Sequence, residues 1–254
     1  IYKLTGACMT DVSNASRTLM YDLYNLDWND KILNYFNISR SSLPQVKPSL
    51  SIFAHETELF KDVPISSVLG DQQASLFGHY GFKKGSIKNT YGTGCFLLCN
   101  TGTEIIKSNN GLLTTIAYQV ENEPPVYALE GSVAIAGASI QWLRDNLGII
   151  KKSSDVDKLA LEVKDNGDVY FVPAFSGLFS PHWDPTARGT IVGLTRYSNK
   201  SHIARAVLES VAYQTNDVLF ALSQDLNHDQ FVLSVDGGMV KSNLLMQYQI
   251  LEWL

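Results

Sequence analysis

The stretch SIKNTYGTGCFLLC, residues 86–99, decides how this chain is interpreted. Two runs rich in strand-forming residues, 86–91 and 95–99, flank Gly92-Thr93-Gly94, and this pattern predicts a β-hairpin. The glycines leave the backbone open, and the Thr93 hydroxyl could bind an oxygen of a phosphate chain. No Gly-Lys-Ser/Thr follows, so the loop is not of the Walker type. A plain hairpin and a phosphate-binding hairpin are compatible, and both interpretations stay open.

Downstream of the hairpin, strand-like and helix-like patterns alternate. Strands are expected at 112–120, 126–130, 169–172 and 231–235, the last of them buried; helices are expected at 135–147, about 200 to 226 and 242–249. Ser201 is a plausible N-cap of the long helix. This order predicts an α/β fold with helices packed on a mixed sheet.

Upstream of the hairpin, an apolar strand at 63–69 runs into Gly70-Asp71-Gln72-Gln73 and a helix at 74–78. Asp71 can be the N-cap of that helix, which is the more frequent use of such a residue. It can also be a general base that takes a proton from an attacking hydroxyl. Sequence order alone does not separate the two roles.

A second glycine-containing turn, Asp236-Gly237-Gly238, lies between a predicted strand and a predicted helix. Glycine lets a backbone approach a ligand closely because it has no Cβ. In isolation, such a pair is more often an ordinary turn.

Composition excludes several classes of function. The chain has 254 residues, a net charge of -5 and no basic tract, so it lacks the electrostatic footprint of a protein that binds nucleic acid or an anionic membrane. No apolar run is long enough to cross a bilayer. Cys8, Cys95 and Cys99 are expected to be reduced, buried thiols, which indicates a cytoplasmic protein.

Several motifs in one order resemble the FGGY family of carbohydrate kinases, and within it the members that phosphorylate glycerol. The matching stretches cover nearly the whole chain: TDVSNASRT (10–18), GDQQA (70–74), KNTYGTGCF (88–96), NGLLTTIA (110–117), AGASIQWLRD (136–145), WDPTARG (183–189) and VDGG (235–238).

This resemblance implies an actin-like ATPase (ribonuclease H-like) fold, with mixed sheets that carry helices on both faces. It implies two domains with ATP and a polyol in the cleft between them. Residues 1–79 would close the first domain, on the substrate side, and residues 80–254 would form the second, on the nucleotide side.

The resemblance also implies roles for individual residues. Asp71 would be the catalytic base, Gln72 would contact glycerol, and Phe96 would pack against its carbon chain. The nucleotide would be bound by Thr93, Gly94, Gly137, Gln141, Gly238 and Ser242. Mg²⁺ would bridge phosphate oxygens with Asp71 near it.

Two departures from the family pattern matter. The family's N-terminal parts have no counterpart here, so the resemblance implies a C-terminal half that is inactive alone. Ser242-Asn243 stands where the family usually has Asn-Asn. The resemblance also implies a homodimer or higher homo-oligomer. The alternative functions are another FGGY sugar kinase or a non-catalytic actin-like nucleotide-binding module.

Overall fold

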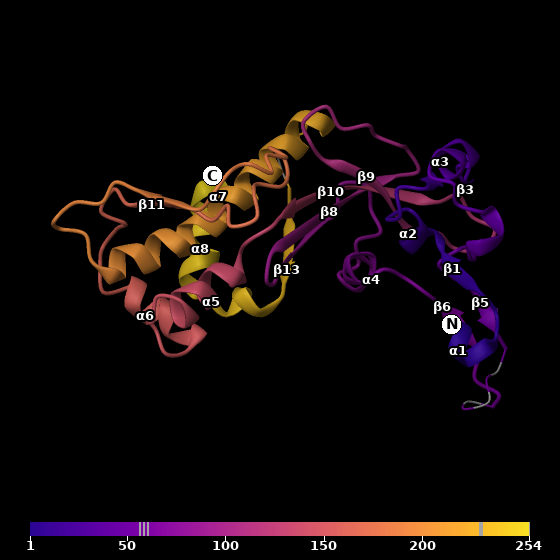
Figure 1. Ribbon diagram of the computed structural model, residues 1–254, viewed down its shortest axis with the longest axis horizontal. Coiled ribbons are helices and arrows are strands. Elements are labelled where there is room, and N and C mark those ends of the chain that lie inside the picture. Colours follow the sequence, from indigo (N-terminus) through magenta and orange to yellow (C-terminus); the bar gives the residue numbers. More distant parts are fainter. Residues whose placement is uncertain (56, 58, 60, 229–230, 254) are drawn as a thin grey trace. The chain divides into compact units, whose positions relative to one another are not determined.

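The structure, a computed structural model, describes residues 1–55, 57, 59, 61–228 and 231–253. The chain divides into two compact units (Figure 1). Unit 1 comprises Ile1–Ile87, Leu98–Lys107 and Leu113–Glu130, and unit 2 comprises Lys88–Leu97, Ser108–Leu112 and Gly131–Leu254. Each unit is described by itself.

Unit 1 is built from short elements around two small apolar clusters. Its elements are α1 (Tyr2–Thr5), β1 (Met9–Asp11), α2 (Val12–Ala15), β2 (Tyr21–Asp22), β3 (Asp27–Trp28), α3 (Asp30–Tyr35), η1 (Arg40–Ser42), β4 (Gln45–Lys47), β5 (Leu50–Ala54), β6 (Ile65–Ser67), α4 (Asp71–Gly78) and β9 (Leu113–Tyr118). Strands β1 and β4 pair in parallel, whereas β5 and β6 pair antiparallel. Tyr21, Trp28 and Leu33 form one cluster with Ile116, and Leu76 packs in the other.

Buried polar side chains also hold unit 1 together. The Asp11 carboxylate is fully buried, caps α2 by accepting from the amides of Ser13 and Asn14, and accepts from the Ser49 hydroxyl at 2.6 Å. These bonds join the start of α2 to the segment at Ser49.

The largest sheet has five strands in the hydrogen-bonded order β13-β7-β8-β10-β9. The additional strands are β7 (Ile87–Tyr91), β8 (Cys95–Gly102), β10 (Val126–Val133) and β13 (Leu233–Asp236). These bounds confirm the predicted hairpin and the predicted strands that follow it. The edge strand β13 is half-buried along its length, so its prediction as a buried strand was wrong.

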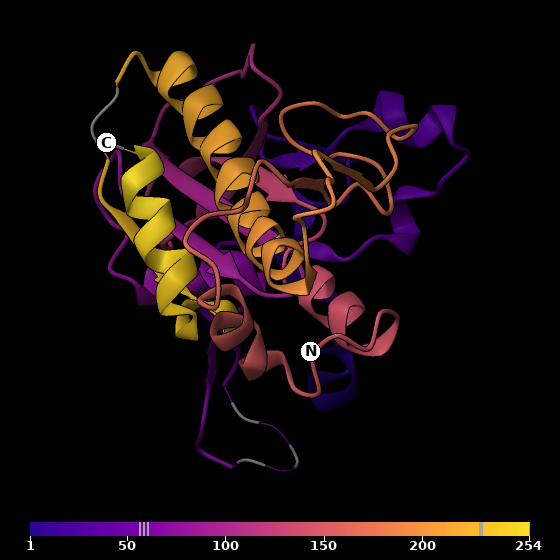
Figure 2. The ribbon, with the colours of Figure 1, turned by 90° about the vertical axis from the view of Figure 1, so that its left-hand side faces the viewer.

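Unit 2 places its helices around the glycine-containing turns. The further elements are α5 (Gly137–Asp145), η2 (Ser153–Asp155), α6 (Val156–Ala160), β11 (Tyr170–Val172), β12 (Thr190–Val192), α7 (Lys200–Leu226), η3 (Gly238–Lys241) and α8 (Asn243–Trp253). Helices α7 and α8 lie side by side in both views (Figures 1 and 2), and the hydroxyls of Tyr213 and Tyr248 share a 2.5 Å hydrogen bond.

Two sequence-based expectations about unit 2 and the cysteines need correction. The N-cap of α7 is Asn199, whose side chain accepts from the amides of Ser201 and His202, while the Ser201 hydroxyl donates to Glu162. Cys95 and Cys99 are buried free thiols as expected, but Cys8 is exposed. Among the described residues, no helix is both long and apolar enough to span a bilayer.

Candidate functional site

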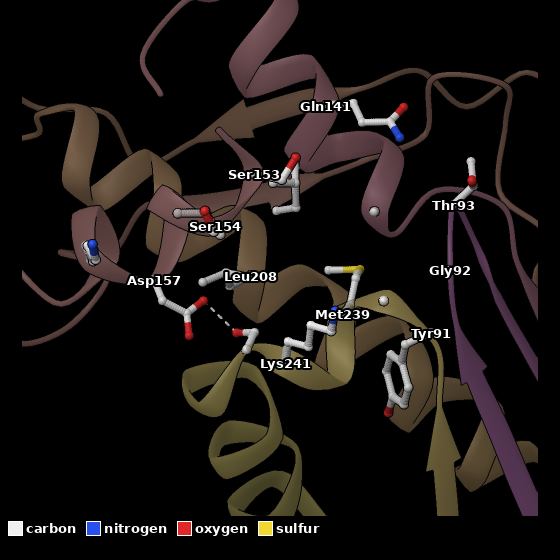
Figure 3. A pocket seen from close by; sticks show the side chains of 16 residues that line it. Tyr91, Gly92, Thr93, Gln141, Ser153, Ser154, Asp157, Leu208, Met239 and Lys241 are labelled. Atoms are coloured by element: carbon white, nitrogen blue, oxygen red, sulfur yellow. Dashed lines mark hydrogen bonds between the residues drawn. The ribbon is translucent and has the colours of Figure 1, made fainter. Parts of the chain in front are cut away.

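Unit 2 contains a cavity of about 630 Å³, here called the glycine-lined pocket. This volume falls within the range of small-molecule sites in proteins. The pocket is lined by Tyr91, Gly92, Thr93, Gly137, Ile140, Gln141, Ser153, Ser154, Val156, Asp157, Lys158, Leu208, Gly238, Met239, Lys241 and Ser242 (Figure 3). These residues come from β7 and its hairpin, α5, η2, α6, α7 and the turn before α8.

The hairpin tip and the start of α5 are locked together by backbone hydrogen bonds. The amides of Ala136 and Ala138 donate to the Thr93 carbonyl at 2.8 and 3.1 Å, and the Gly137 amide donates to the Gly92 carbonyl at 2.9 Å. The first amides of α5 are therefore used by the hairpin. The Thr93 side chain stays exposed at the rim of the pocket, where its hydroxyl can bind a ligand.

Two close backbone contacts of the hairpin require glycine. A Cβ built on Gly94 would lie 2.3 Å from the Val133 carbonyl oxygen, and one built on Gly137 would lie 2.6 Å from the Gly92 carbonyl oxygen. Both contacts are with backbone atoms, which cannot move aside as a flexible side chain could. Gly137 thus permits the close contact between α5 and the hairpin, and Gly94 permits the close contact between the hairpin and the end of β10.

The second glycine turn has two glycines in different situations. Gly237 has φ 97°, and a Cβ there would lie 2.3 Å from the Tyr91 carbonyl oxygen, so the turn packs directly on β7. A Cβ on Gly238 would meet nothing within 4 Å. Gly238 also lines the pocket, so its lack of a side chain leaves room for a ligand at this turn.

On the α6 side of the pocket, Asp157 and Ser242 form a hydrogen-bonded pair, and the dashed line at Asp157 in Figure 3 marks this bond. The Ser242 hydroxyl donates to the Asp157 carboxylate at 2.7 Å and accepts from the Leu245 amide at 3.1 Å. The other carboxylate oxygen of Asp157 accepts from the Leu244 amide at 3.5 Å. The pair therefore caps the start of α8 and at the same time forms part of the pocket wall.

The strands under the hairpin are held by buried groups that stay uncharged. The Tyr91 hydroxyl donates to the Gln249 side-chain oxygen at 3.0 Å, and burial raises the pKa of this hydroxyl above its ordinary value. Burial also raises the pKa of the Cys95 thiol to about 12, so Cys95 is a packing residue and not a nucleophile.

The pocket brings together five of the six residues predicted to bind a nucleotide: Thr93, Gly137, Gln141, Gly238 and Ser242. The sixth, Gly94, is buried beneath the hairpin tip and does not line the cavity. Phe96 also lies outside the lining, and its side chain is 38% exposed between two buried neighbours on β8.

Sequence reasoning missed Asp157, which lines the pocket and holds Ser242. No glycine turn or motif marks its segment. The one signal near it was Ser242, which stands where the family pattern usually has asparagine and whose hydroxyl donates to Asp157.

Asp71 and Gln72 belong to unit 1. Helix α4 begins at Asp71 itself, and its N-cap is Gly70, whose amide donates to the Ser13 hydroxyl at 2.9 Å. Of the two roles left open for Asp71, the structure therefore excludes the N-cap. Its carboxylate is exposed and accepts from the Gln72 amide at 2.8 Å and the Gln72 side-chain nitrogen at 3.3 Å. The oxygens keep lone pairs for a further proton or cation.

The described residues form no cluster of three or more His, Cys, Asp or Glu side chains suited to hold a metal ion. Mg²⁺ does not need such a cluster, because it often binds through one or two carboxylates together with substrate phosphates. The exposed Asp71 carboxylate fits that second kind of site.

Two family models match this chain. The model for the C-terminal domain of the FGGY family of carbohydrate kinases matches residues 87–250, and the model for the N-terminal domain matches residues 1–78.

Similar proteins carry the name glycerol kinase. One from Pseudarthrobacter chlorophenolicus is 55% identical over 246 residues, which are 96% of this chain and 49% of that protein. One from Chloroflexus aurantiacus is 55% identical over 244 residues, again 96% of this chain and 49% of that protein. The chain spans about half the length of the curated relatives it matches.

Solved structures show the same fold. Plasmodium falciparum glycerol kinase with ADP matches with a TM-score of 0.89 and 41% identity, over 98% of this chain and 50% of that one. A ligand-bound xylulose kinase from Lactobacillus acidophilus matches with a TM-score of 0.82 and 24% identity, over 98% and 51%. These likenesses confirm the predicted α/β, actin-like fold.

Proposed function

We propose that this chain, which belongs to the FGGY family of carbohydrate kinases, forms the C-terminal half of an enzyme that phosphorylates glycerol with ATP. The product would be sn-glycerol 3-phosphate. Relatives named glycerol kinase, 55% identical over 96% of this chain, support the choice of acceptor. We also propose that residues 1–79 close the substrate-side domain and residues 80–254 form the nucleotide-side domain.

One observation carries the nucleotide part of this proposal. Five residues that the family resemblance assigns to the nucleotide, from three separate segments of the chain, line one cavity of about 630 Å³. The Thr93 hydroxyl and the Gln141 amide would donate to phosphate oxygens. The first amides of α5 would act indirectly, because they hold the hairpin in place. Gly238 would lie against the adenine.

Asp71 would carry the acid–base chemistry. Its carboxylate would accept the proton of a glycerol hydroxyl while that oxygen forms a bond to the γ-phosphorus of ATP. The bond between this phosphorus and the β–γ bridging oxygen breaks, and its electron pair leaves with ADP. The exposed position of Asp71 at the first turn of α4 supports this role, because both carboxylate oxygens retain accepting capacity.

Gln72 and Phe96 would position the acceptor. The Gln72 amide can donate to a glycerol oxygen, and the exposed Phe96 ring can pack against the carbon chain. Most of the rate enhancement would come from holding the hydroxyl and the phosphorus in line. Asp71 would also lie near Mg²⁺, which neutralises phosphate charge when it is bound.

The family resemblance further suggests a cytoplasmic enzyme that is a homodimer or a larger homo-oligomer. Light scattering on the complete protein measures the molar mass directly. A monomer at micromolar concentration would contradict this part of the proposal.

The central experiment measures phosphorylation of glycerol, xylulose and gluconate by the complete protein, with ATP in excess. We expect kcat/KM for glycerol to exceed the other two by at least about 100-fold, because xylulose and gluconate have longer carbon chains that a site shaped for glycerol does not hold in line with the phosphorus. Equal or better turnover of xylulose or gluconate would show that glycerol is the wrong substrate. Nucleotide binding without turnover of any of the three would favour a non-catalytic module.

A further inference from the structure

The Ser242 hydroxyl has its hydrogen-bonding roles fixed by two neighbours. A hydroxyl has one proton to donate and two lone pairs that accept. Ser242 gives its proton to the Asp157 carboxylate at 2.7 Å, and one lone pair accepts from the Leu245 amide at 3.1 Å. The carboxylate can only accept, so it holds the Ser242 proton in this direction. One lone pair of Ser242 remains available.

The Asp157 side of the pocket therefore presents fixed acceptors. The carboxylate of Asp157 is half-buried, and Ser242 is buried with only 9% of its surface exposed. Both residues line the cavity, so their remaining lone pairs are the fixed polar features that a ligand meets on this wall. A ligand group that donates a hydrogen bond fits there. A group that can only accept a hydrogen bond would place two acceptors opposite each other.

The proposed function decides which part of a nucleotide reaches this wall. Asp157 and Thr93 lie on opposite sides of the pocket (Figure 3). With the phosphates at Thr93, as proposed above, the base lies at the Asp157 side. The apolar side chains of Val156, Leu208 and Met239 also line the cavity and offer surfaces for a flat ring.

We propose that Asp157 determines which nucleobase the pocket accepts, by holding Ser242 as an acceptor for the 6-amino group of adenine. Hypoxanthine and guanine carry a 6-oxo group, which accepts and does not donate, so they are disfavoured. This inference rests on the proposed function, since it assumes that the glycine-lined pocket binds a nucleotide.

The other polar residues of the pocket distinguish less between a 6-amino and a 6-oxo group of the base. Ser153 and Ser154 are exposed, and their hydroxyls can rotate to donate or to accept. Lys158 and Lys241 are exposed ammonium groups on flexible chains that water also solvates. Selection by Asp157 and Ser242 is stronger because their hydrogen bonds leave them no freedom to change roles.

The test compares the affinities of ADP and inosine diphosphate for the complete protein, measured by calorimetry without glycerol. The two ligands differ at the 6-position of the base and in the proton on N1. We expect the native protein to bind ADP at least about tenfold more tightly, which is about 1.4 kcal/mol. In Asp157→Asn the ratio of the two affinities should fall to about threefold or less. The asparagine side chain carries an NH₂ donor in either orientation, and this donor can bind the 6-oxo group of hypoxanthine.

A matched control separates this effect from loss of charge or of helix capping. Asp155→Asn makes the same change two residues earlier, on a carboxylate that accepts from the Lys152 amide and does not line the pocket. It should leave the ratio unchanged. If Asp157→Asn weakens both nucleotides equally and keeps their ratio, Asp157 is only a cap of α8 and the inference is wrong.

Ser242→Ala provides a second route if Asp157→Asn does not fold. Removal of the accepting oxygen should also lower the ratio to about threefold or less, and a preserved ratio would overturn the inference. The proposed function is tested separately: glycerol turnover with an unchanged ratio contradicts the inference alone. ADP selectivity without glycerol turnover contradicts the glycerol assignment alone, and absence of ADP binding contradicts both.

Discussion

The glycine-lined pocket and the Asp71 turn are built in opposite ways. The pocket joins segments from Tyr91 to Ser242 and is fixed by backbone contacts that only glycine permits. The Asp71 turn is local, with its carboxylate bonded to the adjacent residue Gln72. A change in the pocket can therefore alter both folding and binding, whereas a change at Asp71 should alter chemistry alone.

The largest expected effect follows from this independence. Asp71→Asn keeps the shape of the side chain but removes the ability to take a proton. We expect kcat for glycerol phosphorylation to fall by about 100- to 10,000-fold, the usual contribution of a general base. The affinity for ATP should stay within about twofold, because the proposed nucleotide residues lie in the other unit. Steady-state kinetics and calorimetry on the complete protein measure both quantities.

Asp62→Asn is the matched control for that change. Asp62 is an exposed carboxylate of unit 1 with φ 58°, a conformation that asparagine tolerates well. Its replacement should leave kcat unchanged. Near-normal turnover in Asp71→Asn would contradict the role of Asp71 as the base. An equal fall of kcat in both variants would indicate a general effect of the lost negative charge.

Sequence reasoning succeeded where the pattern was long or local. Helix α7 was predicted at about 200 to 226 and spans Lys200–Leu226. The prediction succeeded because apolar residues recur with helical period over 27 residues, so the few residues that break the pattern do not hide it. The hairpin at Gly92-Thr93-Gly94 was also correctly predicted, since flanking strands and glycines are strong short-range signals.

Sequence reasoning failed where a contact between residues distant in sequence determines which of two suitable residues takes a role. Asn199 and Ser201 are both good N-caps, and the hydrogen bond from Ser201 to Glu162 gives Ser201 another role. Asp157 was missed for the same reason. The short segment of α6 shows no motif, and only the tertiary fold brings its carboxylate to within 2.7 Å of the Ser242 hydroxyl.

The next prediction tests whether the pocket depends on glycine for its structure. Gly94→Ala places a Cβ 2.3 Å from the Val133 carbonyl oxygen and 2.8 Å from that of Ala134, so the backbone must shift. We expect the free energy of unfolding to fall by about 1–3 kcal/mol, as in other overpacked sites. Urea titration without nucleotide measures this change.

Gly92→Ala serves as its control within the same hairpin, because a Cβ there would lie 3.7 Å from its nearest neighbour, the Gly94 carbonyl oxygen. That is an ordinary contact distance, so the loss should be smaller. Equal stability of the two variants would show that the close contact of Gly94 with Val133 and Ala134 does not require glycine.

The smallest expected effect separates binding from folding at Gly238. A Cβ there meets nothing within 4 Å, so Gly238→Ala should change the free energy of unfolding by less than about 0.5 kcal/mol. Because Gly238 lines the pocket, the methyl group would occupy space proposed for the adenine, and the Kd for ADP should rise about tenfold. Gly78→Ala, equally uncrowded and outside the pocket, should leave the ADP affinity unchanged and should not lower the free energy of unfolding, because alanine favours the helix in which residue 78 lies. Unchanged ADP affinity in Gly238→Ala would mean that the base does not lie against this turn, and the pocket would then need a different orientation of the nucleotide.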